Sequence, residues 1–178
     1  AQCIHGTMMW PVNDSVIGKC LPLYGEWSEG ENIIMSKYIN EGDTVIDIGA
    51  NIGTTVLPMS NNVGDYGKVI AFEPQSIMSQ CLNTNLTIND ITNVEVYNLA
   101  ISNKNGWAKL NDQKFWKTGR YGSAGISNEG ILPLSLIAIS ISLSSRSPSL
   151  NLFLKLSLVA TVALAPTIAS STLSSANF

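Results

Sequence analysis

Two acidic residues and two glycines lie where consecutive strands of this chain are predicted to end. In the stretch VIDIGANIGTTV, Asp47 follows an apolar run and precedes Gly49 and Gly53. Glu73 closes the next apolar run, KVIAFEP, 20 residues beyond Gly53. A carboxylate there can accept hydrogen bonds from two adjacent ribose hydroxyls, and glycines let backbone amides approach a ligand closely. The pattern therefore favours a site for a nucleoside-bearing ligand.

The glycine spacing does not match the known phosphate-binding loops. The dinucleotide fingerprint G-x-G-x-x-G needs a second glycine where this chain has Asn51. The phosphate loop G-x-x-x-x-G-K-[ST] fails because Gly53 comes one residue early and no lysine follows it. An adenosine-bearing ligand without phosphate, such as S-adenosylmethionine, fits better. The alternative is that the glycines only form a tight turn and that Glu73 is a solvated strand end.

The elements that must position these residues alternate along the chain. Apolar runs and turn signals predict strands at 42–49, 68–74, 94–102 and 107–111, and helices at 30–39, 54–62 and 75–89. Strands that alternate with helices pair in parallel through right-handed crossovers. The sequence therefore predicts an α/β fold with an open, mostly parallel, doubly wound sheet. Ligands bind such sheets beyond the carboxyl ends of the strands.

Charge and cysteine content narrow the partners and the compartment. The 178 residues carry a formal net charge of -3 and form no basic stripe, which disfavours a nucleic-acid partner. The three cysteines, Cys3, Cys20 and Cys81, are far apart and show neither metal-ligand spacing nor a paired framework. We therefore expect no metal site and a reducing compartment, the cytoplasm.

The chain changes character near residue 130. All 13 acidic residues lie between Asp14 and Glu129, and the last 48 residues contain only two charges, Arg146 and Lys155. We divide the chain into an N-terminal flap or lid (1–40), a ligand-binding α/β core (41–130) and an acid-free apolar tail (131–178). The tail is open to three interpretations: a membrane-associated segment, a buried set of strands, or the product of a slipped reading frame.

Three segments resemble a known family: TVIDIGANIGTT, GKVIAFEPQ and CLNTNLTINDITNVEVYNLAIS. Together they are similar to the FkbM-type family of S-adenosylmethionine-dependent methyltransferases, over roughly residues 5–130. The resemblance implies a class I methyltransferase fold, which is Rossmann-like, with S-adenosyl-L-methionine as the cofactor. It implies O-methylation of a sugar, lipid or natural-product hydroxyl, so the acceptor is a small molecule or a glycan or lipid. A membrane is disfavoured as a partner, and the oligomeric state is open.

The resemblance also implies the residues of the cofactor site. Those that would line the methionine side are Asp47, Gly49, Ala50, Asn51 and Gly53. Glu73 would hold the ribose. From the segment YGEWSEGE, Glu26 and Glu29 could close over the pocket. The catalytic base is not identified: His5, the only histidine, is either a candidate base or an exposed or capping residue.

The tail departs from the family pattern. Members have a fourth core strand that ends in acids, and the best candidate here is LKLSLVATV at 154–162, with Ser157 where an acid is expected. An apolar skeleton persists while every acid is missing. The domain is then incomplete or altered at its C-terminus, and the alternative function is a catalytically defective remnant or a cofactor-binding module with a non-native C-terminal half.

Overall fold

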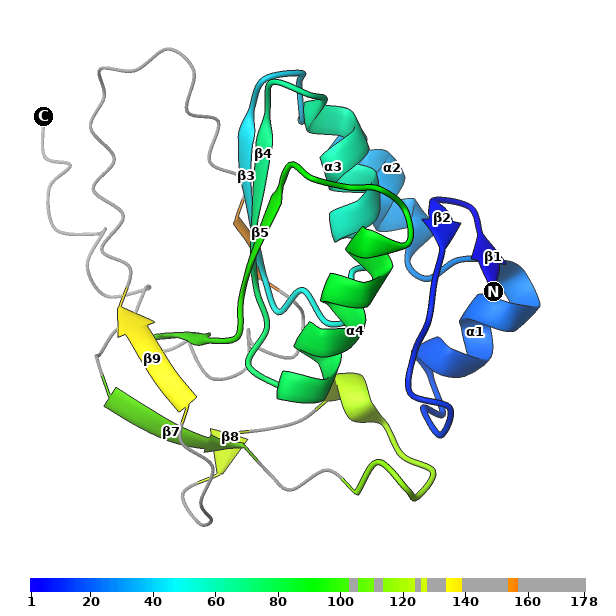
Figure 1. Ribbon diagram of the computed structural model, residues 1–178, viewed down its shortest axis with the longest axis vertical. Coiled ribbons are helices and arrows are strands. Elements are labelled where there is room, and N and C mark those ends of the chain that lie inside the picture. The colour runs from blue at the N-terminus through cyan, green and yellow to red at the C-terminus, as the bar shows by residue number, and fades with distance from the viewer. Residues whose placement is uncertain (103–105, 111–113, 124–125, 128–133, 139–153, 157–178) are drawn as a thin grey trace, which may run out of the picture.

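A parallel sheet of four strands forms the centre of the molecule (Figure 1). The computed structural model describes residues 1–102, 106–110, 114–123, 126–127, 134–138 and 154–156. The sheet order is β10 (Leu154–Leu156), β3 (Thr44–Ile48), β4 (Lys68–Phe72) and β5 (Val94–Tyr97). All neighbours pair in parallel. Followed from β5 to β10, the strands come in the order third, second, first and fourth along the chain. This is the order of a doubly wound sheet. The predicted fold class is therefore confirmed.

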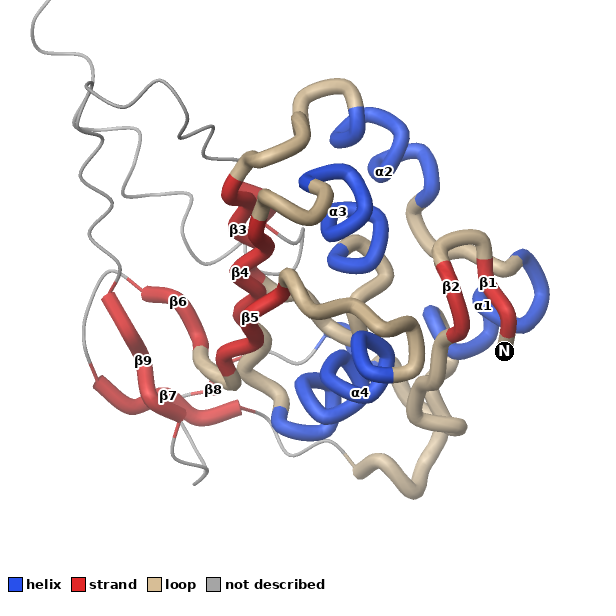
Figure 2. The backbone as a smooth tube through the Cα atoms, turned by 45° about the horizontal axis from the view of Figure 1, so that its top comes forward, coloured by secondary structure: helices blue, strands red, loops and turns tan. Residues whose placement is uncertain are grey.

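Three helices lie on one side of this sheet, two of them against the strands and the third, α2, against α3 (Figures 1 and 2). They are α2 (Glu29–Ser36), α3 (Val56–Val63) and α4 (Ser76–Thr87). Each matches a predicted helix to within a few residues. Pro58 lies in the first turn of α3, where its missing N–H would have no partner within the helix. The proline therefore does not break the helix.

The core lies between the sheet and these helices. Val45 and Val69 of the strands and Leu57, Met78 and Leu82 of the helices are at most 1% exposed. Each such side chain contributes about 1.5–3 kcal/mol on burial. Apolar packing therefore fixes how α3 and α4 lie on the strands, and with them the loops at the carboxyl ends.

The N-terminal segment lies on the far side of the helices from the sheet (Figure 2). It contains a short hairpin of β1 (Gln2–Cys3) and β2 (Gly6–Thr7), followed by α1 (Ile17–Tyr24). We call residues 1–9 the N-terminal strap. Two asparagines, Asn85 of α4 and Asn89 just after that helix, hold its backbone. Asn89 accepts from the Thr7 N–H (2.8 Å) and donates to the Thr7 carbonyl (2.7 Å), and Asn85 does the same to Met9 (2.7 and 3.0 Å).

The prediction of a single strand at 94–102 is wrong. The structure divides it into β5 and β6 (Ala100–Ser102), which belong to different sheets. The chain bends between them, where the Leu99 N–H donates to the Tyr97 carbonyl (2.9 Å). The Asn98 side chain donates to the Glu73 and Pro74 carbonyls (2.7 and 3.0 Å), which draws the chain toward the end of β4.

A second sheet follows this bend. It has the order β6, β9 (Leu134–Ala138), β7 (Gly106–Leu110) and β8 (Ile126–Ser127). A short 3-10 turn, η1 (Tyr121–Ser123), precedes β8. The strand predicted at 107–111 corresponds to β7.

In the tail, the predicted fourth core strand is present next to the first. Residues Leu154–Leu156 form β10, in which Lys155 pairs with Asp47 of β3. Ser157 and the rest of 157–162 lie outside the described residues. Among the described residues, no helix has the length and apolar character needed to cross a bilayer.

Candidate functional site

The loop after β3 turns back onto the end of β4. The Gly49 and Ala50 N–H groups both donate to the Phe72 carbonyl (2.8 and 3.0 Å). Gly49, Asn51 and Gly53 have φ values of 86°, 52° and 94°. Glycine adopts such angles at little cost, and asparagine tolerates them better than most residues. This alternation of positive φ values makes the sharp turn that the spacing of the glycines indicated.

Glu73 joins this loop to the start of α4. Its carboxylate accepts the Asn51 N–H at Oε2 (2.8 Å) and the Gln75 N–H at Oε1 (2.8 Å). Glu73 is only 3% exposed. Burial raises the pKa of Glu73 to about 7, and the charge of Asp47 adds to this, although the two backbone hydrogen bonds lower it. The prediction that the glycine loop and this acid come together is therefore met in the structure.

Asp47 lies inside β3 and points at the start of α3. It is 1% exposed, and its Oδ2 accepts a hydrogen bond from the Thr55 hydroxyl (2.7 Å). A buried carboxylate needs such partners, since an unpaired charge in the interior is costly. Asp47 therefore ties the strand to the helix that follows it. Contact between Asp47 and a cofactor remains a prediction.

Gly53 and Ala50 serve the packing of the loop. A Cβ atom on Gly53 would come within 2.6 Å of Leu82 Cδ1 and 3.2 Å of Leu57 Cδ1. Ala50 is 2% exposed, and its carbonyl accepts the Gly53 N–H (2.9 Å). The contacts of Gly53 thus support the interpretation that this glycine allows a tight turn and close packing. The N–H groups of Ala50 and Gly53 are both used within the fold, since they donate to the Phe72 and Ala50 carbonyls.

A third segment of the site, the η1 turn, is not predicted by the sequence. The Gln75 Nε2 group donates to the Tyr121 carbonyl (2.9 Å), and a Cβ on Gly122 would lie 2.8 Å from Asn51 Nδ2. Tyr121 is 1% exposed and its ring packs edge-on against Phe115 (4.8 Å between centroids). The turn therefore rests on the residues that flank Glu73. No spacing rule connects positions so far apart in the chain.

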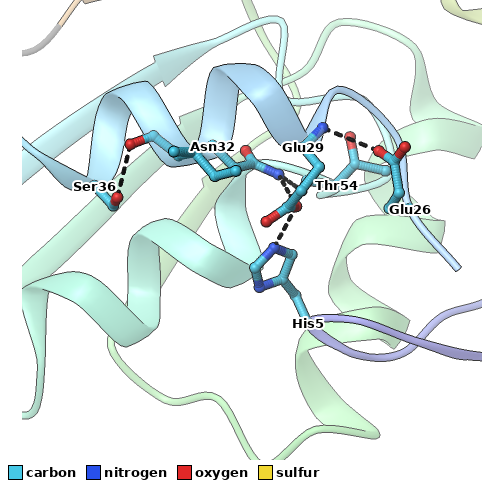
Figure 3. A network of polar contacts seen from close by, with 7 residues as sticks. His5, Glu26, Glu29, Asn32, Ser36 and Thr54 are labelled. Carbon is cyan, nitrogen blue, oxygen red and sulfur yellow. Dashed lines mark hydrogen bonds and ion pairs between the residues drawn. The ribbon is translucent and has the colours of Figure 1, made fainter.

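A polar network occupies the N-terminal end of α2 (Figure 3). His5 Nε2 and Glu29 Oε2 are 2.7 Å apart, and Asn32 Nδ2 donates to the same oxygen (3.2 Å). Burial acts to raise the pKa of Glu29, but the hydrogen bonds from His5 and Asn32 and the His5 charge hold it below its ordinary value. Glu26 Oε2 accepts the Glu29 N–H (2.9 Å) and so caps the helix.

This network meets the loop after β3 at one point. Asn32 Nδ2 lies 3.5 Å from the carbonyl oxygen of Thr54, the residue after Gly53. Asn32 is 4% exposed. The hydrogen bonds of Glu26 and Glu29 described here hold α2 and His5. A role of Glu26 in holding a cofactor remains a prediction.

The described part of the chain contains no group of three or more His, Cys, Asp and Glu residues arranged to hold a metal ion. Cys3, Cys20 and Cys81 are all free thiols. The site is thus built from carboxylates, amides and backbone groups. Such groups can bind and orient hydroxyl, amine and cationic groups of a ligand.

The sequence matches the Methyltransferase FkbM domain over residues 47–148, which is more than half of the chain. Among solved structures, it is similar to a SAM-dependent methyltransferase from Aquifex aeolicus (26% identity, TM-score 0.37, 50% of this chain and 46% of that one). It is also similar to a SAM-dependent O-methyltransferase from Thermotoga maritima (25%, 0.37, 39% and 27%). The aligned part thus spans less than half of either protein. A comparison with curated proteins found no match.

Proposed function

Since this chain belongs to the methyltransferase FkbM domain family, we propose that it transfers a methyl group from S-adenosylmethionine to a hydroxyl oxygen of its acceptor. The observation that carries the proposal is the hydrogen bond from the Asn51 N–H to the Glu73 carboxylate (2.8 Å). It joins the glycine loop to an acid at the end of the next parallel strand. In open α/β sheets, this edge is where ligands bind.

The residues present fit the nucleoside part of this cofactor. A carboxylate offers about four lone-pair sites, and Glu73 uses one on each oxygen for Asn51 and Gln75. Two acceptor sites are left for two adjacent ribose hydroxyls. Since Glu73 is only 3% exposed, residues that cover its carboxylate must shift to admit the ligand.

The chain's own contribution to the reaction is positioning. The bound cofactor supplies the reactive methyl group on its sulfonium, so the protein must align two partners rather than provide a covalent group. Asp47, Gly49, Ala50, Asn51 and Gly53 would line its methionine side, and Glu26 would close over it. The catalytic base is not assigned: His5 bonds to Glu29 through Nε2, which leaves Nδ1 as the atom that could accept a proton.

The acceptor that we propose is a sugar, lipid or natural-product hydroxyl, in the cytoplasm. The net charge of -3 and the lack of a basic stripe support a small molecule or glycan rather than a nucleic acid. A second candidate function, a cofactor-binding module without turnover, is favoured by the acid-free sequence of residues 131–178. We also propose that the chain divides into a flap (1–40), an α/β core (41–130) and a tail (131–178). The change in acid content near residue 130 supports the second boundary.

Calorimetry with S-adenosylhomocysteine tests the proposal. Wild type should bind, and Glu73→Gln should bind about 100-fold more weakly, because hydrogen bonds to a charged group contribute about 1.5–3 kcal/mol each. Glu95→Gln is the matched control, since Glu95 is exposed on β5 and pairs with Lys68. A folded wild type that does not bind at millimolar ligand would refute the proposal.

A transfer assay then separates the two candidate functions. Radiolabelled S-adenosylmethionine is offered with a panel of sugars, glycolipids and phenolic alcohols. Label in an ether-linked methyl group supports the enzyme. Cofactor binding without label in any acceptor supports the binding module.

A further inference from the structure

Gln75 presents a buried acceptor atom that has no hydrogen-bond partner in the described part of the chain. The residue is 8% exposed, and its Oε1 makes no hydrogen bond among the residues that the structure describes. An amide oxygen that is buried without a hydrogen-bond partner destabilises the folded protein. Its other side-chain atom is occupied, because Nε2 donates to the Tyr121 carbonyl (2.9 Å). The amide is thus fixed in orientation with its oxygen free.

The backbone directs Gln75 to the same side as Glu73. The two residues are separated only by Pro74, and Gln75 itself is extended (φ -78°, ψ 113°). Side chains two apart on an extended chain point the same way. The Gln75 N–H also donates to Glu73 Oε1 (2.8 Å), which keeps the two residues together. Gln75 therefore belongs to the site around Glu73 rather than to the exposed surface of α4.

The same cluster contains the loop and the η1 turn. Asn51 donates its N–H to Glu73, and Gly122, next to the Tyr121 that Gln75 holds, lies against the Asn51 amide. Three segments distant in sequence thus converge on one carboxylate and one unpartnered amide oxygen. Because both are acceptors, the group that would satisfy them carries several hydrogen-bond donors.

We propose that Gln75 Oε1 accepts a hydrogen bond from the nucleoside part of the cofactor and so determines specificity for it. This inference rests on the proposed function. Two donors have this chemistry: one of the two ribose hydroxyls, in which case Glu73 accepts from the other, and the exocyclic amine of the adenine. The bond to Tyr121 orients the amide, so the η1 turn sets the position of the acceptor atom.

Calorimetry with ligand analogues tests the inference. The ligands are S-adenosylhomocysteine, its inosine analogue, which lacks the exocyclic amine, and its 2′-deoxy and 3′-deoxy analogues. Each is titrated into wild type and into Gln75→Met, which preserves side-chain length but lacks the amide. One analogue lacks the donor that bonds to Gln75, and wild type should bind it more weakly than S-adenosylhomocysteine. In Gln75→Met, this ratio of the two affinities should be about fivefold smaller than in wild type. A purely structural role would weaken all four ligands equally.

Gln80→Met is the matched control, since Gln80 is exposed on the same helix and should leave every ratio unchanged. Equal ratios in wild type and Gln75→Met for all three analogues would overturn the inference and leave the proposed function intact. Failure of wild type to bind S-adenosylhomocysteine would overturn both.

A measurement on wild type covers the case in which Gln75→Met does not fold. With carbon-13 at the glutamine side-chain carbonyls, the Gln75 resonance should move downfield when S-adenosylhomocysteine is added, as expected when a carbonyl gains a hydrogen bond. An unmoved Gln75 resonance with bound ligand would overturn the inference.

Discussion

The glycine loop with Glu73 and the N-terminal strap are both held by hydrogen bonds from side chains to backbone, yet their surroundings differ. Around the loop, Leu57 and Leu82 are completely buried and leave no room for a Cβ on Gly53. At the strap, the His5 and Glu29 side chains are each 26% exposed. Packing thus determines the loop in addition to its hydrogen bonds, whereas in the strap only Cys3 and Met8 are buried in the core and the other residues depend on polar contacts. A single substitution should therefore cost more at the loop.

The largest effect is expected at Gly53. Gly53→Ala should lower the free energy of unfolding by about 4 kcal/mol, from strain at positive φ and overpacking against Leu82. Gly42→Ala is the matched control, because Gly42 also has positive φ (85°) but no atom within 4 Å of the added Cβ. It should cost about 1 kcal/mol. Urea unfolding measures both, and equal losses would show that packing does not distinguish the loop.

The next effect comes from the buried charge of Glu73. Burial raises its folded pKa to about 7, above the ordinary 4.5. Between these pH values the folded protein holds a proton that the unfolded chain has lost, so stability falls as pH rises through this window. The full loss is about 3 kcal/mol. The difference in unfolding free energy between wild type and Glu73→Gln should therefore change by this amount from pH 4 to pH 8.

The exposed Glu95 again provides the control for this titration. Glu95→Gln removes an acid whose pKa is lowered, chiefly by its hydrogen bond to Lys68. It should not reproduce a loss of stability with rising pH. Parallel pH profiles for wild type and Glu73→Gln would mean that the carboxylate is not buried as described.

A smaller effect is expected where the strap joins α4. Asn85 is completely buried, and its amide bonds to Met9 on both sides and to the Ile52 carbonyl (2.8 Å). Asn85→Ala should cost about 2 kcal/mol, because a strap that loses this anchor can detach and let water satisfy its backbone. Hydrogen exchange should accelerate at Met9 and not in β3. Asn83→Ala, an exposed neighbour on α4, should leave exchange unchanged.

The sequence predicted the loop far better than the strap, and the difference has a physical cause. Apolar runs, glycines and Pro74 are local signals, so they fixed β3, β4, α4 and the meeting of the loop with Glu73. The strap depends on contacts such as Thr7 with Asn89, which join residues 82 positions apart through single amide groups. Such pairs leave no periodic pattern in a sequence.

The same reasoning explains the errors at the site. The bend after Tyr97 depends on the Asn98 side chain reaching back to Glu73 and Pro74, and alternation alone did not reveal it. For Gln75, the sequence predicts only that it begins a helix. Its position two residues after Glu73 indicates that the two side chains point the same way. The orientation of the Gln75 amide, however, depends on the Tyr121 carbonyl of the η1 turn, which no local pattern reveals.

The smallest effect is expected at the ion pair of the strap. Glu29→Gln removes the charge that bonds to His5 and should cost about 1 kcal/mol at pH 7. Because the folded pKa of Glu29 is lowered below 4.5, its contribution is present above that value and disappears as the carboxylate protonates at lower pH. Glu41→Gln, at an exposed acid, is the control. Urea unfolding at pH 7 and pH 3 measures the change.

The chain's single histidine makes the assignment of this effect direct. Its one imidazole C2–H resonance should shift in Glu29→Gln and stay fixed in Glu41→Gln. A stability loss that persists unchanged at pH 3 would mean that Glu29 acts through packing, as residues of the loop do. A loss that disappears with the charge would mean that Glu29 stabilises the contact between α2 and the strap through electrostatics, in contrast to the packing that determines the loop.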